Sequence, residues 1–315
     1  MTRLAVNSPA VKTLDASVAR ARLAERLGYE SVWVTQLPDA RDAALVLSAY
    51  ASATERLKLG TGVLPIYTRH PTAMAQMAAT LDELSGGRFI LGLGISHKVT
   101  VENMWGLRIE SPVEAMREYV QIVRTSLRDG GSDFEGRFFT ARWRYSGPRR
   151  ADMPIMISAL QPRMLALAGA VTDGIVLWMC SPRYIKEHVV PAVTAGRRKA
   201  GKALQGFEIV AAIPISLTSD RAGAQDVFRR TVSTYASLPY YRKALDAGGY
   251  AAELEAGTPS EAMLDDLAGL GDEQQVRDAI QRYRDAGVTL PAVGPFGGHE
   301  GAAGFEATLE AAAGA

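Results

Sequence analysis

The sequence has a single cysteine, Cys180, in 315 residues, and it lacks an excess of charge of either sign. One thiol forms neither an internal disulfide nor a thiolate metal cluster. The 35 Lys and Arg residues nearly balance the 34 Asp and Glu residues, which leaves a formal net charge of +1. This balance provides no overall field for a nucleic acid or an anionic membrane. We therefore expect neither as a partner.

Long apolar runs are absent as well. No stretch reaches the about 20 apolar residues of a membrane-spanning helix, and the N-terminal MTRLAV enters a strand pattern without a signal-peptide core. We therefore expect a cytoplasmic protein. What the chain does contain is 47% hydrophobic residues, enough to bury the large core of one α/β barrel or of two medium-sized domains.

Strand and helix patterns alternate along the whole chain. Eight strands, each followed by a helix, is the count of a (β/α)8 TIM barrel, which we expect as one domain over residues 1–315. The strands are expected at 3–7, 31–35, 57–63, 88–94, 154–159, 173–179, 207–216 and 288–293. The helices are expected near 15–27, 42–53, 70–84, 111–129, 162–171, 182–204, 220–237, 272–286 and 302–313.

Two segments depart from this alternation. Residues 130–150 are rich in glycine and aromatic residues and predict a hairpin within the same domain. Residues 238–270 have weak helical periodicity and are a candidate lid. If this segment folds over the mouth of the barrel, Tyr67, Tyr240 and Tyr241 could line the substrate space.

The segment from residue 70 to residue 97 is the most informative part of the chain. An amphipathic helix runs to Leu84 and breaks at residues 85–87, where Gly86 can adopt the left-handed cap and Gly87 lets the chain turn sharply. The strand that follows is almost wholly apolar, which indicates burial on both faces in a parallel sheet. Ser96 and His97 come just after its carboxyl end, where parallel α/β folds place their chemistry.

The residues at the expected strand ends are poor in acids and show no metal-ligand spacing. Of the four histidines, His97 alone lies at such an end, and no cysteine accompanies it. Metal-assisted hydrolysis and nucleophilic triads are therefore disfavoured. A wide, largely apolar mouth with amides, hydroxyls and one imidazole suits a large planar cofactor that supplies the chemistry itself.

The run TLDELSGGRFILGLG resembles the luciferase-like monooxygenase superfamily, whose members are TIM barrels that use a flavin or a deazaflavin. WVTQLPDARDA, GTGVLPIYTRHP and DAGVTLPAV match in the same order. GLGISH and RHP are more similar to the branch that uses the deazaflavin coenzyme F420, which includes methylene-tetrahydromethanopterin reductases. The resemblance implies a homodimeric F420-dependent oxidoreductase that transfers a hydride between the cofactor and an organic small molecule.

The resemblance also implies roles for residues around strands three and four. Gly62 and Val63 would form a bulge with a non-prolyl cis peptide behind the cofactor ring; the alternative is a simple β-bulge. Gly94, Ser96 and His97 would lie beside the ring. A neutral imidazole at His97 could donate a hydrogen bond or the proton that accompanies hydride transfer. The alternative is a loop histidine that caps a neighbouring turn.

Other strand ends supply further candidates. Gln36 could contact the substrate or the ring edge and Asp39 could act as an acid, although a turn with Asp42 capping the next helix explains Asp39 equally well. Trp178 would be a wall of the pocket or a buried core residue. The resemblance also implies that the loop from strand five into the next helix binds the phosphate-bearing side chain of the cofactor. The alternative is an ordinary strand–helix junction. The loop residues concerned are Ser158, Ala159, Leu160 and Arg163.

Three other functions stay open. An FMN-dependent monooxygenase of the same superfamily would use reduced flavin and oxygen. A flavin- or deazaflavin-binding protein would bind tightly without turnover. A barrel enzyme without a flavin is the third alternative.

Overall fold

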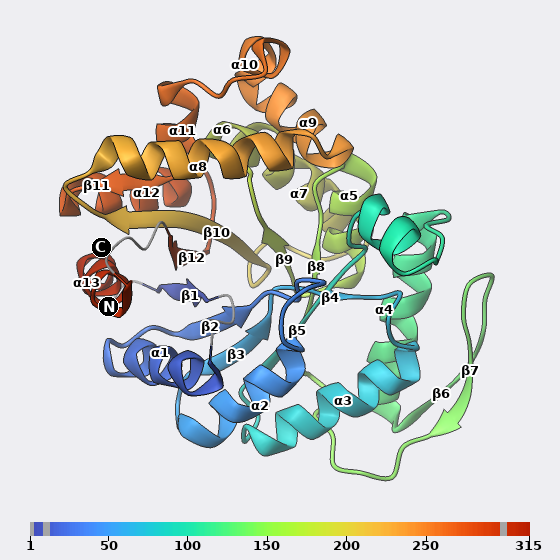
Figure 1. Cartoon of the computed structure of the whole chain (residues 1–315). Helices are drawn as coiled ribbons and strands as arrows, with labels where there is room; N and C mark the ends of the chain where they lie inside the picture. The colour runs from blue at the N-terminus through green and yellow to red at the C-terminus, as the bar shows by residue number, and fades with distance from the viewer. Residues whose placement is uncertain (1–2, 9–12, 297–300) are drawn as a thin grey trace.

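Eight parallel strands form a closed ring in the computed structural model, which describes residues 3–8, 13–296 and 301–315. The ring closes where the eighth strand pairs with the first (Figure 1), which confirms the predicted TIM barrel. In ring order the strands are β1 (Ala5–Asn7), β2 (Ser31–Val34), β3 (Lys58–Thr61), β5 (Phe89–Gly94), β8 (Ile155–Ser158), β9 (Gly174–Leu177), β10 (Glu208–Leu217) and β12 (Leu290–Pro295).

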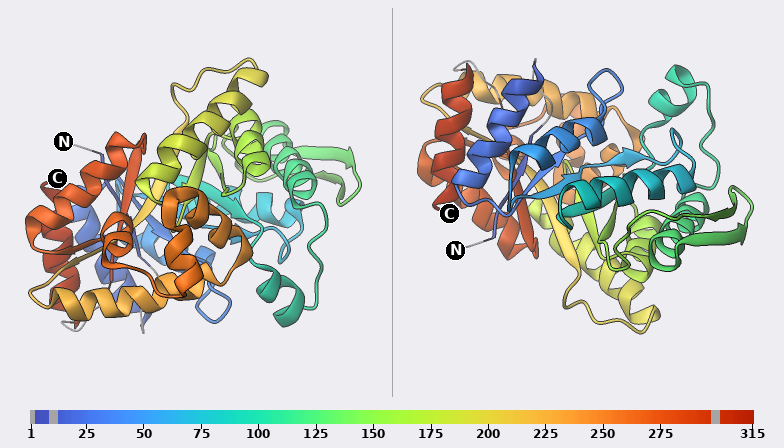
Figure 2. Two further views of the ribbon diagram at one scale, coloured as in Figure 1. Left: turned by 90° about the horizontal axis from the view of Figure 1, so that it is seen from above. Right: turned by 90° about the horizontal axis from the view of Figure 1, so that it is seen from below.

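Helices surround this ring on the outside, as Figures 1 and 2 show. The expected helix at 182–204 is divided into α6 (Pro182–Tyr184), the π-helix η2 (Ile185–Val189) and α7 (Val190–Lys199), and it ends earlier because the chain turns at Gly201, whose φ is 71°. The other helices are α1 (Leu14–Arg26), α2 (Ala43–Ala53), α3 (Pro71–Leu84), α4 (Pro112–Asp129), α5 (Pro162–Val171), α8 (Arg221–Ala236), α12 (Glu273–Asp285) and α13 (Gly301–Ala313). In the described part of the chain, no helix is both long and apolar enough to cross a membrane.

The third strand is shorter than its sequence pattern predicts. It ends at Thr61, and a short strand β4 (Leu64–Pro65) then resumes the pairing with β5. Where the backbone pairing is interrupted, the Thr61 hydroxyl bonds the backbone of Gly92 instead. It donates to the Gly92 carbonyl at 2.8 Å and accepts from the Gly92 amide at 2.7 Å. The interruption falls at Gly62 and Val63, where the resemblance implies a bulge.

Large side chains fill the middle of the barrel. Trp33 is buried there and lies over Gly60, where an added Cβ would come within 2.5 Å of the indole ring. The barrel is therefore a packed core, and space for a ligand can exist only at its ends. The inner cluster consists of Ala5, Trp33, Ile90, Met156, Val210, Leu290 and Ala292.

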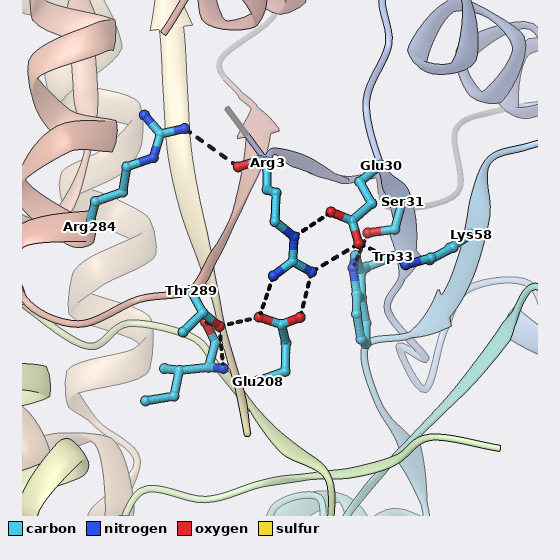
Figure 3. Close-up of polar contacts among 9 residues, drawn as sticks. Arg3, Glu30, Ser31, Trp33, Lys58, Glu208, Arg284 and Thr289 are labelled. Carbon is cyan, nitrogen blue, oxygen red and sulfur yellow. Dashed lines mark hydrogen bonds and ion pairs between the residues drawn. The ribbon is translucent and has the colours of Figure 1, made fainter. Parts of the chain in front are cut away.

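The amino end of the barrel is closed by a network of ion pairs, drawn in Figure 3. Arg3 binds Glu30 and Glu208, each at 2.6 Å, and Lys58 binds Glu30 at 2.9 Å. The hydrogen bond from Arg3 lowers the pKa of the Glu30 carboxyl to about 2. The charges at this end are thus paired with each other.

The glycine-rich turn before β5 is part of the same structural end. Gly86 and Gly87 have φ values of 65° and 82°, which confirms the predicted left-handed cap at Gly86 and places the predicted turn at Gly87 in the same region. Arg88, which follows them, donates to the carbonyls of Leu57 at 2.7 Å and Ala51 at 3.0 Å. These bonds satisfy carbonyl groups near the end of α2 and tie it to the start of β5.

Both predicted excursions are structured. The hairpin at 130–150 is confirmed as β6 (Gly131–Glu135) and β7 (Thr140–Arg144), and Figure 2 shows it projecting from the barrel. The segment at 238–270 packs with α8 around a second apolar core. It contains α9 (Pro239–Leu245), the π-helix η3 (Asp246–Tyr250), α10 (Ala251–Ala256), α11 (Glu261–Leu267) and the start of β11 (Gly269–Gly271), an additional strand beside β10 that the sequence did not predict.

Candidate active site at the carboxyl ends of the strands

Small residues form the inner layer at the carboxyl end of the barrel. Side chains alternate along a strand, so the residues two or four positions beyond the inner cluster face the same interior. Such positions include Gly94, Ser158 and Gly294, and Gly62 joins this layer just after β3, where an added Cβ would lie 3.5 Å from Cβ of Trp33. In contrast to the layer filled by Trp33, this layer receives no large side chain from these four strands.

Three of the predicted cofactor-binding residues lie together in this layer. A Cβ added to Gly94 would lie 2.5 Å from Cγ2 of Val63 and 2.7 Å from Oγ of Ser158, so the protein itself requires glycine there. At Gly62, the nearest atom to an added Cβ is Cβ of Trp33 at 3.5 Å, an ordinary contact. The peptide bond between Gly62 and Val63 is cis, as the resemblance implies. The protein's own packing leaves room for a side chain at Gly62, which fits close approach by a ligand.

Ser96 and His97 follow β5 in an unusual backbone conformation. Ser96 has a φ of 58°, in the left-handed region, which costs a non-glycine residue about 1 to 3 kcal/mol and is found mostly at functional sites. The His97 carbonyl accepts from the amides of Thr100 at 3.0 Å and Val101 at 2.9 Å, where the π-helix η1 (Val99–Met104) begins. These bonds fix the backbone at the strand end.

The His97 imidazole itself has no hydrogen-bond partner among the described residues. It therefore does not cap a neighbouring turn, which was the alternative. Burial lowers its pKa below the ordinary value of 6.5, so the ring is neutral at neutral pH. A neutral imidazole without a partner can donate or accept one proton at a ligand.

A row of aromatic rings begins at His97 and runs across the mouth. The His97 ring centroid lies 5.7 Å from that of Tyr241 on α9, and Tyr241 lies 4.9 Å from Tyr235 on α8. Tyr235 in turn lies 5.7 Å from Trp178, which follows β9. Trp178 is partly buried, packs against the second core and stands in this row, so it is not a fully buried core residue, and its role as a pocket wall stays a prediction. Tyr235 is a candidate that sequence reasoning missed, since helical periodicity alone gives it no distinction.

The hydroxyl of Tyr67 is buried and has no hydrogen-bond partner in residues 3–8, 13–296 and 301–315. Burial raises the pKa of this phenol to about 12, with a further contribution from Tyr240. The hydroxyl is therefore a neutral donor. A ligand that accepts its hydrogen bond would be stabilised, because the bond offsets the cost of burying the donor unpaired.

Gln36 and Asp39 are placed differently from His97. The Gln36 amide is used within its own loop, because Oε1 accepts from the Ala43 amide at 2.8 Å and Nε2 donates to the Leu37 carbonyl at 3.2 Å. Asp39 is exposed in a turn, and Asp42 caps α2, as the alternative predicted. The described residues give neither side chain a hydrogen bond with His97, and the two catalytic roles stay predictions.

The loop before α5 has few free donors for an anion. Pro162 occupies the first turn, as predicted, and lacks an amide hydrogen. The Met164 amide donates to the Gln161 carbonyl at 3.0 Å. Arg163 is exposed and forms no ion pair among the described residues, so its side chain and amide are available to a phosphate. The Gln161 side chain donates to the Tyr240 carbonyl at 3.0 Å and links this loop to α9.

Comparisons with known proteins give a family match and similar relatives. Residues 2–290 match the model of the family described as luciferase-like monooxygenase. A 5,10-methylenetetrahydromethanopterin reductase from Methanolobus tindarius is 31% identical over 293 residues, which cover 88% of this chain and 89% of the relative.

Two solved structures share the fold over almost the whole chain. The coenzyme F420-dependent tetrahydromethanopterin reductase from Methanopyrus kandleri superposes with a TM-score of 0.81 at 24% identity, covering 99% of this chain and 97% of the other. An F420-dependent secondary alcohol dehydrogenase in complex with an F420–acetone adduct gives 0.79 at 20% identity, covering 99% of each chain.

Proposed function

Because this chain belongs to the luciferase-like monooxygenase family, we propose that it is a coenzyme F420-dependent oxidoreductase that transfers a hydride between the deazaflavin and an organic small molecule. Its similarity to a methylenetetrahydromethanopterin reductase over 88% of the chain supports this branch of the family. When bound, the deazaflavin supplies the hydride chemistry, and the protein supplies binding, orientation and proton handling.

The inner layer at the carboxyl end is the structural observation that carries the proposal. Gly62 leaves the backbone open to a flat ring, while Val63 and Ser158 fill the space that a side chain at Gly94 would need. Trp33 fills the middle of the barrel beneath this layer, so a cofactor ring bound here would lie on the packed core and could not enter it. In this arrangement Arg163 would hold the charged tail, and Ser96 would lie near the ring edge.

The polar groups around this layer suit a hydride reaction. His97 would give a proton to the substrate or take one from it, because its imidazole is neutral and has no competing partner. The buried Tyr67 hydroxyl, which has no partner among the described residues, would donate a hydrogen bond to the ligand. The aromatic row of His97, Tyr241, Tyr235 and Trp178 would keep water from this side of the site.

A fluorescence titration of the purified protein with oxidised F420, and separately with FMN, tests the proposal. We expect F420 to bind with a Kd on the order of micromolar or tighter, and FMN to bind more weakly. Preference for FMN with oxygen-dependent turnover would instead support a flavin monooxygenase. Tight F420 binding with no turnover across a substrate panel would indicate a binding protein, and binding of neither cofactor would contradict the assignment.

The proposal includes a cytoplasmic homodimer, paired through helices on one side of the barrel. Sedimentation of the full chain should then give twice the chain mass of 33.8 kDa, and a monomer at micromolar concentration would contradict it.

A further inference from the structure

We propose that Tyr241 is a positioning residue for His97: its ring fixes the orientation of the imidazole and shields it from water. The effect on turnover rests on the function proposed above, whereas the effect on the imidazole does not. Tyr241 thereby gives the segment at 238–270 a specific task at the site.

The contact joins two elements that are far apart in the sequence. His97 follows β5, and Tyr241 lies on α9 with its ring centroid 5.7 Å from the imidazole and the ring planes at 49°. The described residues give the imidazole no hydrogen bond, so no polar contact sets its orientation. The Tyr241 ring is the neighbour from another element that can do so.

Tyr241 is itself held from behind. The edge of Tyr235 meets its ring at 4.9 Å and 74°, and Trp178 supports Tyr235 at 5.7 Å and 73°. At the neighbouring position, the Tyr240 carbonyl accepts from Gln161 at 3.0 Å, which ties α9 to the loop before α5. Edge-to-face pairs and this bond restrict the ring, as a residue that orients another must be restricted.

The groups near His97 include an ion pair on its own segment and a neutral phenol on α9. Lys98 and Glu102, the charged residues next to it on its own segment, pair with each other at 3.5 Å. Of the titratable residues on α9 (Tyr240, Tyr241, Arg242 and Lys243), Tyr241 has a ring contact with the imidazole, and burial raises its own pKa well above the ordinary value. The lowered pKa of His97 has burial as its cause, and the ring of Tyr241 contributes that burial.

Histidine titration by NMR in the protein without cofactor tests the proposal directly. The chain has four histidines, and a His97→Gln variant assigns the His97 resonance. In Tyr241→Leu we expect the pKa of His97 to rise toward its ordinary value, because water reaches the imidazole. Tyr241→Phe keeps the ring and should retain the low pKa. Tyr240→Ala, at the neighbouring position on α9, is the matched control and should leave it unchanged.

Turnover gives the second readout. In Tyr241→Leu we expect kcat to fall about tenfold with little change in KM, and the acid limb of the pH profile to move with the NMR pKa. Tyr241→Phe should restore both. A folded Tyr241→Leu variant with the wild-type His97 pKa would overturn the proposal.

Two further outcomes distinguish the positioning role of Tyr241 from the proposed F420-dependent function. If Tyr241→Leu does not fold, Tyr235→Leu removes the support behind Tyr241, and an unchanged His97 pKa there would overturn the proposal equally. A raised His97 pKa in a protein that neither binds nor uses F420 would leave the positioning role intact and refute the proposed function.

Discussion

The two ends of the barrel satisfy their polar groups in opposite ways. At the amino end, Arg3 forms ion pairs with both Glu30 and Glu208, each at 2.6 Å (Figure 3). At the carboxyl end, the His97 imidazole and the Tyr67 hydroxyl have no hydrogen-bond partner in the part of the chain that the structure describes. An unpaired buried hydroxyl costs stability, so a ligand that accepts a hydrogen bond from Tyr67 would remove that cost at the carboxyl end.

The two ends of the barrel also differ in which residues adopt the left-handed backbone conformation. Before β5, at the amino end, the left-handed residues are Gly86 and Gly87, for which this conformation carries no steric penalty. After β5 and β9, at the carboxyl end, they are Ser96 and Met179, with φ values of 58° and 52°. Turns at the first end use the residue best suited to them, whereas those at the second end tolerate strain.

The largest expected effect is on unfolding free energy, and it distinguishes Gly92 on β5 from Gly62, which follows β3. In Gly92→Ala the new Cβ would lie 2.0 Å from the Thr61 carbonyl oxygen, so we expect a loss of about 3 kcal/mol or more of unfolding free energy. In Gly62→Ala the nearest atom is at 3.5 Å, and stability should change little while F420 affinity falls about tenfold or more. Urea unfolding and fluorescence titration measure the two quantities. Equal stability of both variants would contradict the packing described here.

His97→Ala should affect function without affecting the fold. If the imidazole transfers a proton, turnover should fall roughly 10²-fold or more, while the urea midpoint stays near that of the wild type. Steady-state kinetics with F420 and a turned-over substrate would measure the loss. Unchanged turnover would remove His97 from the mechanism.

Arg3→Ala is the corresponding change at the amino end. Arg3 is about half exposed, so its two ion pairs should contribute only about 1 kcal/mol to the unfolding free energy, and F420 affinity should be unchanged. Lys58→Ala removes one exposed partner of Glu30 and should cost about half as much. A loss of cofactor binding in Arg3→Ala would show that the two ends are coupled.

The smallest effect is a difference in pH dependence. The folded pKa of Glu30 is about 2 against an ordinary 4.5, so its stabilising contribution is complete above 4.5 and is lost as the pH falls toward 2. The folded pKa of His97 lies below 6.5, so the folded protein binds fewer protons and loses stability as the pH falls past 6.5.

Each loss should disappear in its own variant. Glu30→Gln should flatten the unfolding free energy between about pH 4.5 and pH 2, and His97→Gln should flatten it just below about pH 6.5. Unfolding followed across this range measures both. A single window shared by both variants would contradict the separation of the two ends.

Several local features were predictable because they depend on near neighbours in the sequence. Gly86 and Gly87 mark the end of α3, Pro162 marks the start of α5, and Asp42 caps α2 through its own side chain. The strand interrupted at Gly62 could not be predicted from the strand pattern alone. That interruption depends on the pairing of Thr61 with Gly92, a residue of another strand.

The sequence by itself therefore determined the barrel, since alternation with periods of 2 and 3.6 residues is a local property of each segment. It also marked Ser96 and His97 as residues at a strand end. Only the tertiary structure decided that His97 faces Tyr241 and that Arg3 reaches Glu208, because closure of the ring brings together residues whose distance in the sequence carries no signal of contact. The most motif-like run, around Gly86 and Arg88, belongs to the end that stabilises the fold, while the site lies at the other end of the same strand.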